Sequence, residues 1–286
     1  MANLVKKIRT NEGDLPIDYG ALANLPAINN NLLINSDFRN PVNQRGKTSY
    51  TGTGSSILYT IDRWGVINGP TLTIQQGDSL KIQNPSNSAY SARFKQVFEN
   101  ALPVDFYTIS VKVKSNTNKV YINNLGEIQA GFTGIYSHTS IERSLSEIDI
   151  IIAPGASIEI EWIKLERGTA ATPFVPRPYG EEIALCRRYY KKYEHTYFIG
   201  IGMATSDGVV LPLSQEPMYG GKPILTVLSA VTFNPTSNLT SKFVNLSSDY
   251  AVVNQQSQFV SFKLGTATPG EIGRIYGKFE LDAEIY

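Results

Sequence analysis

The chain has 286 residues, of which 42% are hydrophobic and 18% are charged, and its formal net charge at pH 7 is +1. This composition is typical of a folded protein, and the length suffices for two domains of ordinary size. The near-zero net charge excludes a broad positive field, so we expect no nucleic-acid partner and no recruitment to anionic lipid.

No apolar run approaches the ~20 residues that span a bilayer, and the first residues show neither an apolar signal core nor a cleavage site. We therefore expect synthesis in a cytoplasm and no membrane insertion. The single cysteine, Cys186, excludes an internal disulfide. Its place on a predicted apolar helical stripe favours a buried, inert thiol.

Residues 1–30 show no strong period, because their apolar residues are dispersed among turn formers. A segment of this kind cannot bury a core by itself. We expect a leader that is either flexible or packed against partner chains.

In residues 31–168, short apolar runs alternate with Gly, Pro and Asn turn signals, a pattern typical of all-β proteins. The apolar residues of 107–113 alternate with polar ones, which predicts a strand with one dry face. Many short strands without a covering helix predict a jelly-roll-like β-sandwich. Trp64 and Trp162 both occupy positions whose side chains are predicted to point into the core. We therefore expect both rings to be structural core residues rather than surfaces on which a sugar stacks.

Residues 157–193 join two modules through a strand, a connector and a helix. The apolar parity of the strand reverses at Ile163, which indicates either a β-bulge or a strand covered on both faces. Three prolines between residues 173 and 178 favour an extended tether, so residues 169–193 are interpreted as linker and helix. The apolar stripe that predicts a helix over 181–193 consists of Ile183, Cys186, Tyr190 and Tyr193.

Residues 194–286 return to a β pattern, with a hairpin expected around Ser206–Gly208. We expect a smaller C-terminal β-sandwich domain. Sixteen tyrosines are many for this length, and the predicted strands have few dry positions for them, so we expect some to be exposed. Exposed tyrosines suit saccharide or protein recognition, and rim or subunit-interface tyrosines are an equally good alternative. The candidate ligand-binding residues are Tyr219, Phe233, Asp249 and Tyr250.

Catalysis is poorly supported by the sequence. Neither His138 nor His195 lies in a nucleophile motif, in a metal-ligand spacing or beside the cysteine. Glu159 and Glu161 share one strand face roughly 7 Å apart, a spacing compatible with a glycosidase pair, but acidic alternation on an exposed strand is the commoner meaning. No acidic cluster of the calcium-loop kind is present, so we expect no metal and no cofactor.

Several segments resemble tail fibres and related tail proteins of bacteriophages and prophages. The opening of their sandwich modules is similar to Asn31–Phe38, Gln44–Gly46 and Tyr59–Trp64, and their closing signature to Glu161–Glu166, Thr172–Tyr179 and Cys186–Tyr190. The leader of this chain resembles a short motif that recurs in phage fibre and baseplate proteins. The residues that carry this resemblance are Ile17, Tyr19, Leu22 and Pro26. Here Asn40–Asn43 stands where the usual opening has an aromatic residue, so we expect a differently shaped loop.

This resemblance implies a homotrimeric receptor-binding protein of the virion tail. The leader motif would attach it to tail or baseplate proteins, and residues 194–286 would face a glycan or protein of the host cell surface. Two alternatives stay open. One is a structural tail or baseplate adaptor that touches no receptor, and the other is a polysaccharide-degrading enzyme or its detached binding module.

Overall fold

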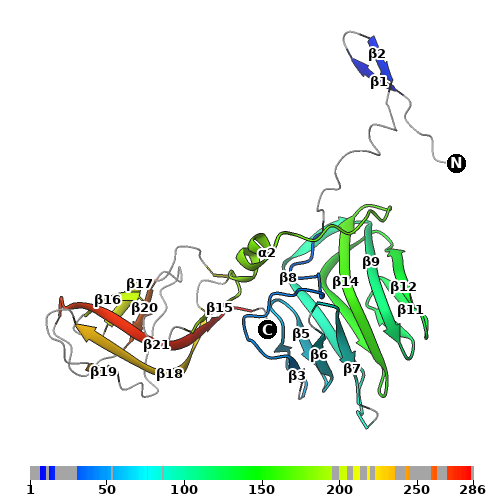
Figure 1. The fold of residues 1–286 in the computed structure, drawn as a ribbon. Helices are drawn as coiled ribbons and strands as arrows, with labels where there is room; N and C mark the ends of the chain where they lie inside the picture. The colour runs from blue at the N-terminus through cyan, green and yellow to red at the C-terminus, as the bar shows by residue number, and fades with distance from the viewer. Residues whose placement is uncertain are drawn as a thin grey trace.

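A computed structural model gives the fold of the chain. The residues it describes are 7–10, 13–16, 31–52, 54–75, 77–85, 87–194, 200–204, 209–212, 218–219, 223–235, 242–244, 259–262 and 269–284. The predicted all-β class is confirmed: every strand pair within these ranges is antiparallel, and a short helix lies between the two main β regions (Figure 1).

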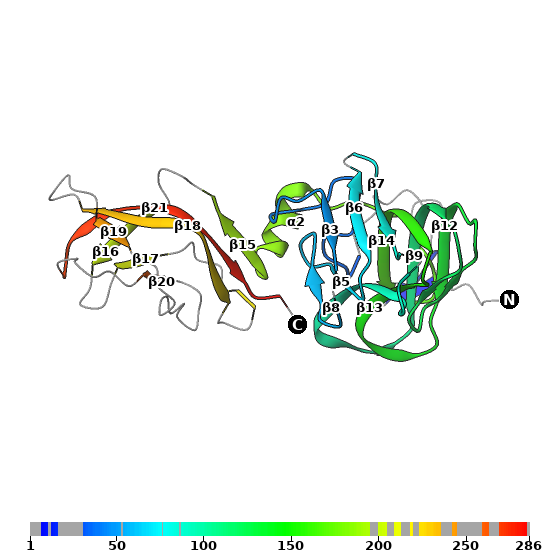
Figure 2. The same cartoon turned by 90° about the horizontal axis from the view of Figure 1, so that it is seen from below.

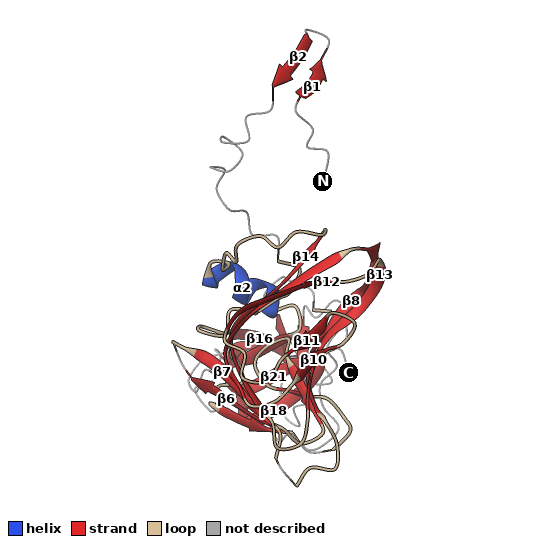
Figure 3. Cartoon of the chain, turned by 90° about the vertical axis from the view of Figure 1, so that its right-hand side faces the viewer, coloured by secondary structure: helices blue, strands red, loops and turns tan. Residues whose placement is uncertain are grey.

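Two six-stranded sheets form a β-sandwich from residues 49–167, and they lie as separate layers in Figure 3. The β13 sheet has the order β11-β10-β13-β8-β5-β4. Its strands are β4 (Leu58–Tyr59), β5 (Gly65–Ile67), β8 (Ala92–Asp105), β10 (Val120–Ile122), β11 (Gly126–Ile128) and β13 (Arg143–Ile152). The β14 sheet has the order β12-β9-β14-β7-β6-β3. Its strands are β3 (Ser49–Thr51), β6 (Thr71–Gln75), β7 (Ser79–Gln83), β9 (Tyr107–Asn116), β12 (Gly134–Thr139) and β14 (Ser157–Arg167).

The core of the sandwich lies between these sheets. The predicted dry face of β9 is buried throughout. Trp64 is 0% exposed, with its ring stacked on Phe94 at 4.7 Å between centroids and edge-on to Phe38 at 5.4 Å. Its indole N–H donates to the carbonyl of Asn35 at 2.8 Å, so the one polar atom of the ring is satisfied.

The sequence of β14 predicted either a β-bulge or a strand covered on both faces, and the structure shows both features. Its register against β9 shifts between Glu159 and Trp162, as a bulge requires. Beyond the bulge both faces are covered, because the connector folds back over the outer face. There Trp162 stacks on Phe174 at 4.6 Å with an interplanar angle of 3°, and the ammonium of Lys164 pairs with Glu166 at 3.1 Å. Trp162 is therefore buried under the connector, outside the space between the two sheets.

The helix is shorter than predicted. It is α2 (Tyr179–Cys186), and residues Tyr190–Tyr193 form strand β15 instead. The expectation of a helix over 181–193 is wrong for these residues because β15 pairs with β21 (Ile272–Asp282), and sheet pairing overrides a helical spacing of apolar residues.

The described strands that follow α2 belong to one seven-stranded sheet, where two facing sheets were expected. The predicted hairpin is present, with Ala204 opposite Val209. Figure 2 shows α2 and β15 between the sandwich and the rest of this sheet. Its further strands are β16 (Gly200–Ala204), β17 (Val209–Pro212), β18 (Ile224–Pro235), β19 (Lys242–Val244) and β20 (Phe259–Phe262).

The leader contains one antiparallel pair, β1 (Lys7–Thr10) with β2 (Gly13–Pro16), which its irregular pattern did not predict. The four predicted attachment residues lie outside the described residues. They are Ile17, Tyr19, Leu22 and Pro26.

The burial of Trp64 predicts a large loss of stability on truncation. Trp64→Ala removes a fully buried indole and should lower the free energy of unfolding by about 3–5 kcal/mol in urea titrations. Tyr90→Ala is the control, because that ring is 69% exposed and its removal should change stability by less than about 0.5 kcal/mol. Equal unfolding midpoints for the two variants would contradict the assignment.

Candidate functional site

Three sequence motifs meet where the sandwich joins the C-terminal sheet, and the third of them, Cys186–Tyr190, leads into β15. Gln44 and Arg45 come from the loop before β3, and Asp62 and Arg63 from the turn between β4 and β5. Arg63 has a left-handed φ of 69°, and the next residue, Trp64, is anchored in the core. This turn therefore directs the arginine away from the core and toward the C-terminal sheet.

Arg63 is buried at this junction, at 1% exposure. Its guanidinium donates to the Glu284 carboxylate at 2.6 Å and to the Val97 carbonyl at 2.5 Å. Its backbone N–H donates to the other carboxylate oxygen of Glu284 at 3.0 Å. The guanidinium also lies 3.6 Å from the centre of the Tyr189 ring, a cation–π contact.

Arg45 makes a cation–π contact like that of Arg63, but with Tyr190, the residue after Tyr189. Its guanidinium lies 3.9 Å from the Tyr190 ring centre. It also lies 3.3 Å from the carboxylates of Asp62 and Asp282 and 3.7 Å from that of Glu284. We call this set the junction clamp; it consists of Gln44, Arg45, Asp62, Arg63, Tyr189, Tyr190, Asp282 and Glu284.

Gln44 completes the clamp by joining both sides. Its side-chain amide donates to the Asp62 carboxylate at 2.7 Å and to the Tyr190 carbonyl at 2.8 Å. On the C-terminal side, the Ala283 backbone N–H donates to the Tyr189 carbonyl at 2.7 Å. The sandwich and the C-terminal sheet are thus linked at one place by contacts of arginine with tyrosine rings, by ion pairs and by hydrogen bonds.

Burial raises the pKa values of two acids of the clamp. Burial raises the pKa of Asp62 to about 7, although Arg45 and Gln44 act in the opposite direction. Burial likewise raises the pKa of Glu284 against the effect of Arg63 and Arg45. Nearby, burial raises the pKa of the Cys186 thiol, and the side chain is 0% exposed, in keeping with an inert cysteine.

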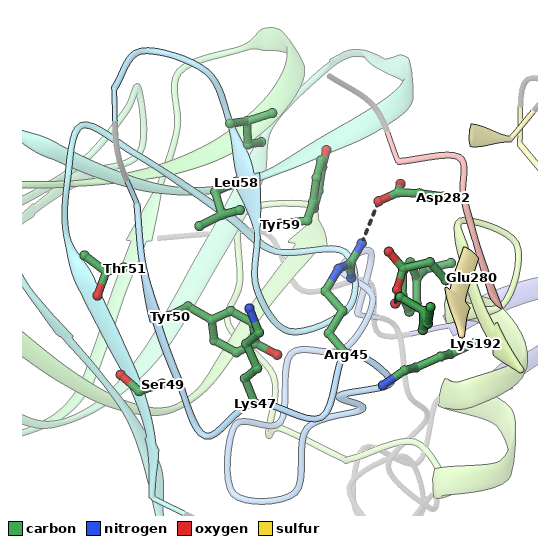
Figure 4. A pocket seen from close by; sticks show the side chains of 13 residues that line it. Arg45, Lys47, Ser49, Tyr50, Thr51, Leu58, Tyr59, Lys192, Glu280 and Asp282 are labelled. Carbon is green, nitrogen blue, oxygen red and sulfur yellow. Dashed lines mark hydrogen bonds and ion pairs between the residues drawn. The ribbon is translucent and has the colours of Figure 1, made fainter. Parts of the chain in front are cut away.

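Beside the clamp lies a pocket of about 520 Å³, which we call the junction pocket (Figure 4). Its walls come from β3 and β4 of the sandwich and from β15, β18 and β21 of the C-terminal sheet. Within it the Tyr190 hydroxyl donates to Glu280 at 2.5 Å, and the Tyr50 hydroxyl donates to Asn43 at 2.6 Å. The lining residues are Arg45, Lys47, Ser49, Tyr50, Thr51, Ile57, Leu58, Tyr59, Tyr190, Lys192, Leu228, Glu280 and Asp282.

This lining is suited to holding a polar ligand. It offers hydroxyls, two ammonium groups and carboxylates beside tyrosine rings and leucine methyls, and the hydroxyls of Tyr50 and Tyr190 are already fixed by partners. Histidine and cysteine are absent from the residues that line it.

The ligand-binding residues predicted from the sequence do not meet in one place. Tyr219 lies beside the clamp, with its ring centre 5.8 Å from that of Tyr189 and its backbone N–H donating to the Arg188 carbonyl at 2.7 Å. Phe233 is 0% exposed in the core of the C-terminal sheet, so the surface platform expected for it is wrong. The other two, Asp249 and Tyr250, lie outside the described residues.

Two of the possible catalytic residues, Glu159 and His138, have structural partners. Glu159 pairs with Lys114 at 3.2 Å and accepts a hydrogen bond from Ser79 at 2.7 Å. Burial acts to raise the pKa of Glu159, but Ser79 and Lys114 outweigh it and leave that pKa below its usual value. This is unsuitable for the proton donor of a glycosidase pair. His138 stacks on Tyr136, and His195 lies outside the described residues.

Within the described part of the chain, no three His, Cys, Asp or Glu side chains are grouped so as to hold a metal ion. Nor does any described helix have the length and apolar character needed to cross a bilayer.

Sequence reasoning missed the roles of Arg45 and Glu284. Arg45 lies in a motif that was noted only for its resemblance. Glu284 lies two residues beyond β21 and shares the parity of the half-buried Glu280 and Asp282, not that of the buried Phe279 and Leu281. The alternation of β21 therefore gave no signal that Glu284 is buried.

Comparisons with known proteins give no family. No family model matches the chain, and no curated protein is similar to it. Among solved structures, a family 29 carbohydrate-binding module is similar at 13% identity and a TM-score of 0.29, over 42% of this chain and 88% of the module. The family 11 module of a cellulosomal cellulase of Clostridium thermocellum is similar at 12% identity and a TM-score of 0.22. This similarity covers 51% of this chain and 99% of the module.

A tandem domain of two family 22 modules from Paenibacillus barcinonensis gives 9% identity and a TM-score of 0.30, over 91% of this chain and 98% of that one. Scores this low establish neither a common fold nor a common ligand.

The clamp predicts that Glu284 is essential to stability. Glu284→Ala leaves the Arg63 guanidinium buried without its carboxylate, and should lower the free energy of unfolding by about 3–5 kcal/mol in urea titrations. Glu142→Ala, at an exposed glutamate of the sandwich, should change it by less than about 0.5 kcal/mol. A loss no larger than that of the control would show that the clamp contributes little.

The raised pKa of Asp62 predicts a pH dependence of stability. Between its ordinary pKa of 3.8 and about 7, the folded state holds a proton that the unfolded state has lost. Stability therefore falls as pH rises through that window and levels off above it. Asp62→Asn cannot titrate, so the decrease between pH 5 and pH 8 should be smaller in this variant. The same decrease in both proteins, measured by urea unfolding, would contradict the assignment.

Proposed function

We propose that the chain is a non-catalytic receptor-binding protein of a bacteriophage or prophage tail, and that it holds a host-surface saccharide in the junction pocket. The observation that carries this proposal is a polar pocket of about 520 Å³ with walls from two β units that the junction clamp joins. A pocket already formed before binding loses less entropy when the ligand enters.

The chemistry of the lining supports a saccharide as the ligand. Lys47, Ser49 and Thr51 offer donors and acceptors at the exposed rim, where hydroxyl groups of a sugar would bind. The Leu58 side chain, 40% exposed, offers an apolar surface for the C–H faces of the ring.

The place of this protein in a phage tail rests on the motifs that resemble tail fibres. Several of them contribute to the clamp, which gives them a shared structural role in joining a sandwich to the unit that follows it. In this proposal the leader attaches to tail or baseplate proteins through Ile17, Tyr19, Leu22 and Pro26. Three copies then present three pockets, and avidity offsets weak binding at each.

Filling the junction pocket tests the proposal. Ser49 is exposed on β3 and lines the pocket, so Ser49→Trp should occupy it without disturbing the core. We expect intact thermal melting and at least a roughly tenfold loss in binding to host cells and to a glycan array, about 1.4 kcal/mol. Ser146→Trp, at an exposed serine of β13, is the control and should bind like the wild type.

Three outcomes would contradict the proposal. If the wild-type chain binds neither cells nor glycans, the structural adaptor is favoured. If Ser49→Trp binds as well as Ser146→Trp, the pocket is not the site. If the chain releases reducing ends from surface polysaccharide and Glu159→Gln or Glu161→Gln abolishes this, the protein is an enzyme.

A further inference from the structure

A row of four side chains crosses the outer face of the β13 sheet, in a region separate from the junction pocket. Strand register places Tyr121 of β10 opposite both Glu127 of β11 and Ile151 of β13, and Ile151 opposite Arg93 of β8. Directly paired residues point to the same face, and neighbouring strands are about 4.8 Å apart. We call this set the Tyr121 row.

The row surrounds a hollow in the surface. Beside Tyr121 lies a depression of about 460 Å³ whose polar lining residues are Asn123, Asn124 and Glu127. Tyr121 is 47% exposed, and the half-buried Ile151 beside it extends its apolar surface. Strand β11 lies at the end of the sandwich far from α2 and β15 (Figure 1), so the hollow is remote from the clamp.

The charges of the row are compensated locally. The Glu127 carboxylate accepts a hydrogen bond from Gln129 at 2.7 Å and pairs with Lys119 at 3.1 Å. At the other end, Arg93 pairs with Asp149 and lies 3.4 Å from Glu147. Each end therefore carries a charged group with an opposite charge beside it, which favours a neutral ligand over a polyanion or a cation.

We infer that the Tyr121 row is a second ligand site, for a neutral saccharide chain lying across β11, β10 and β13. A sugar ring would stack its C–H face on Tyr121 and Ile151. Its hydroxyls would donate to the Glu127 carboxylate and bond the amides of Asn123 and Asn124, the pairing of an aromatic face with planar polar groups that suits sugar rings. This site does not depend on the junction pocket or on the role in a phage tail.

The mixed lining favours a sugar over a second copy of the chain. A contact between copies on a flat sheet face would be expected to have a larger apolar centre than one tyrosine and one half-buried isoleucine. Amide and carboxylate groups beside the ring would then lose water without a designated partner.

The test is titration of the full chain with mannohexaose, cellohexaose and xylohexaose by calorimetry. We expect at least one of these neutral probes to bind, and Tyr121→Ala to weaken that binding by about tenfold while melting is unchanged. Tyr90→Ala is the matched control, because Tyr90 is a 69% exposed tyrosine of the same sandwich outside the row, and it should bind like the wild type. Ser49→Trp should also leave this binding unchanged, which separates the row from the junction pocket.

The inference is overturned if none of the three probes binds the wild type, or if Tyr121→Ala and Tyr90→Ala bind alike. It is also overturned if the mass of the chain in solution falls on Tyr121→Ala substitution, because the row would then be a contact between copies of the chain.

Discussion

The carboxylate of Glu284 is the group on which the arrangement of this protein depends. It lies two residues beyond the last strand, is buried, and is shared by two arginines that come from separate loops of the sandwich. Removing such charges from water is costly, and only close opposite charges and complete hydrogen bonding offset that cost. The structure offsets part of this cost through the ion pairs of Glu284 and through the contacts of the two guanidinium groups with the rings of Tyr189 and Tyr190, although the Arg63 Nε has no hydrogen-bond partner.

This constraint explains why the junction pocket exists. The clamp holds β15 and β21 against the loops that precede β3 and β5, and the space left beside it is lined from both sides. A pocket between two β units keeps its shape only if the units do not move independently. The same interaction therefore supports both the stability of the join and the proposed capacity to bind.

Much of the fold could be predicted because sheet periodicity is local. The dry face of β9 and the irregularity in β14 follow from alternation within about ten residues. The end of the helix could not be predicted, since Tyr190–Tyr193 becomes a strand only by pairing with a segment about 90 residues away. The prediction of an exposed Phe233 was wrong for a related reason. The ring lies near predicted turns, and its burial depends on strands that are distant in the sequence.

The functional site was harder to predict than the fold. The arginine motifs were visible as resemblances, but the chemistry of the clamp depends on which distant carboxylate each guanidinium meets, and spacing along the chain carries no such information. Tyr121 was one of sixteen tyrosines, and only strand register shows that Glu127 and Ile151 flank it on one face.

The central claim is that the clamp makes the sandwich and the C-terminal sheet one rigid body. The most direct test is the distribution of distances between spin labels on Ser146→Cys of the sandwich and Thr226→Cys of β18, with the buried Cys186 left unlabelled. The account predicts one narrow distribution that broadens when Glu284→Ala is added. A broad distribution already present in the labelled protein with Glu284 intact would contradict it.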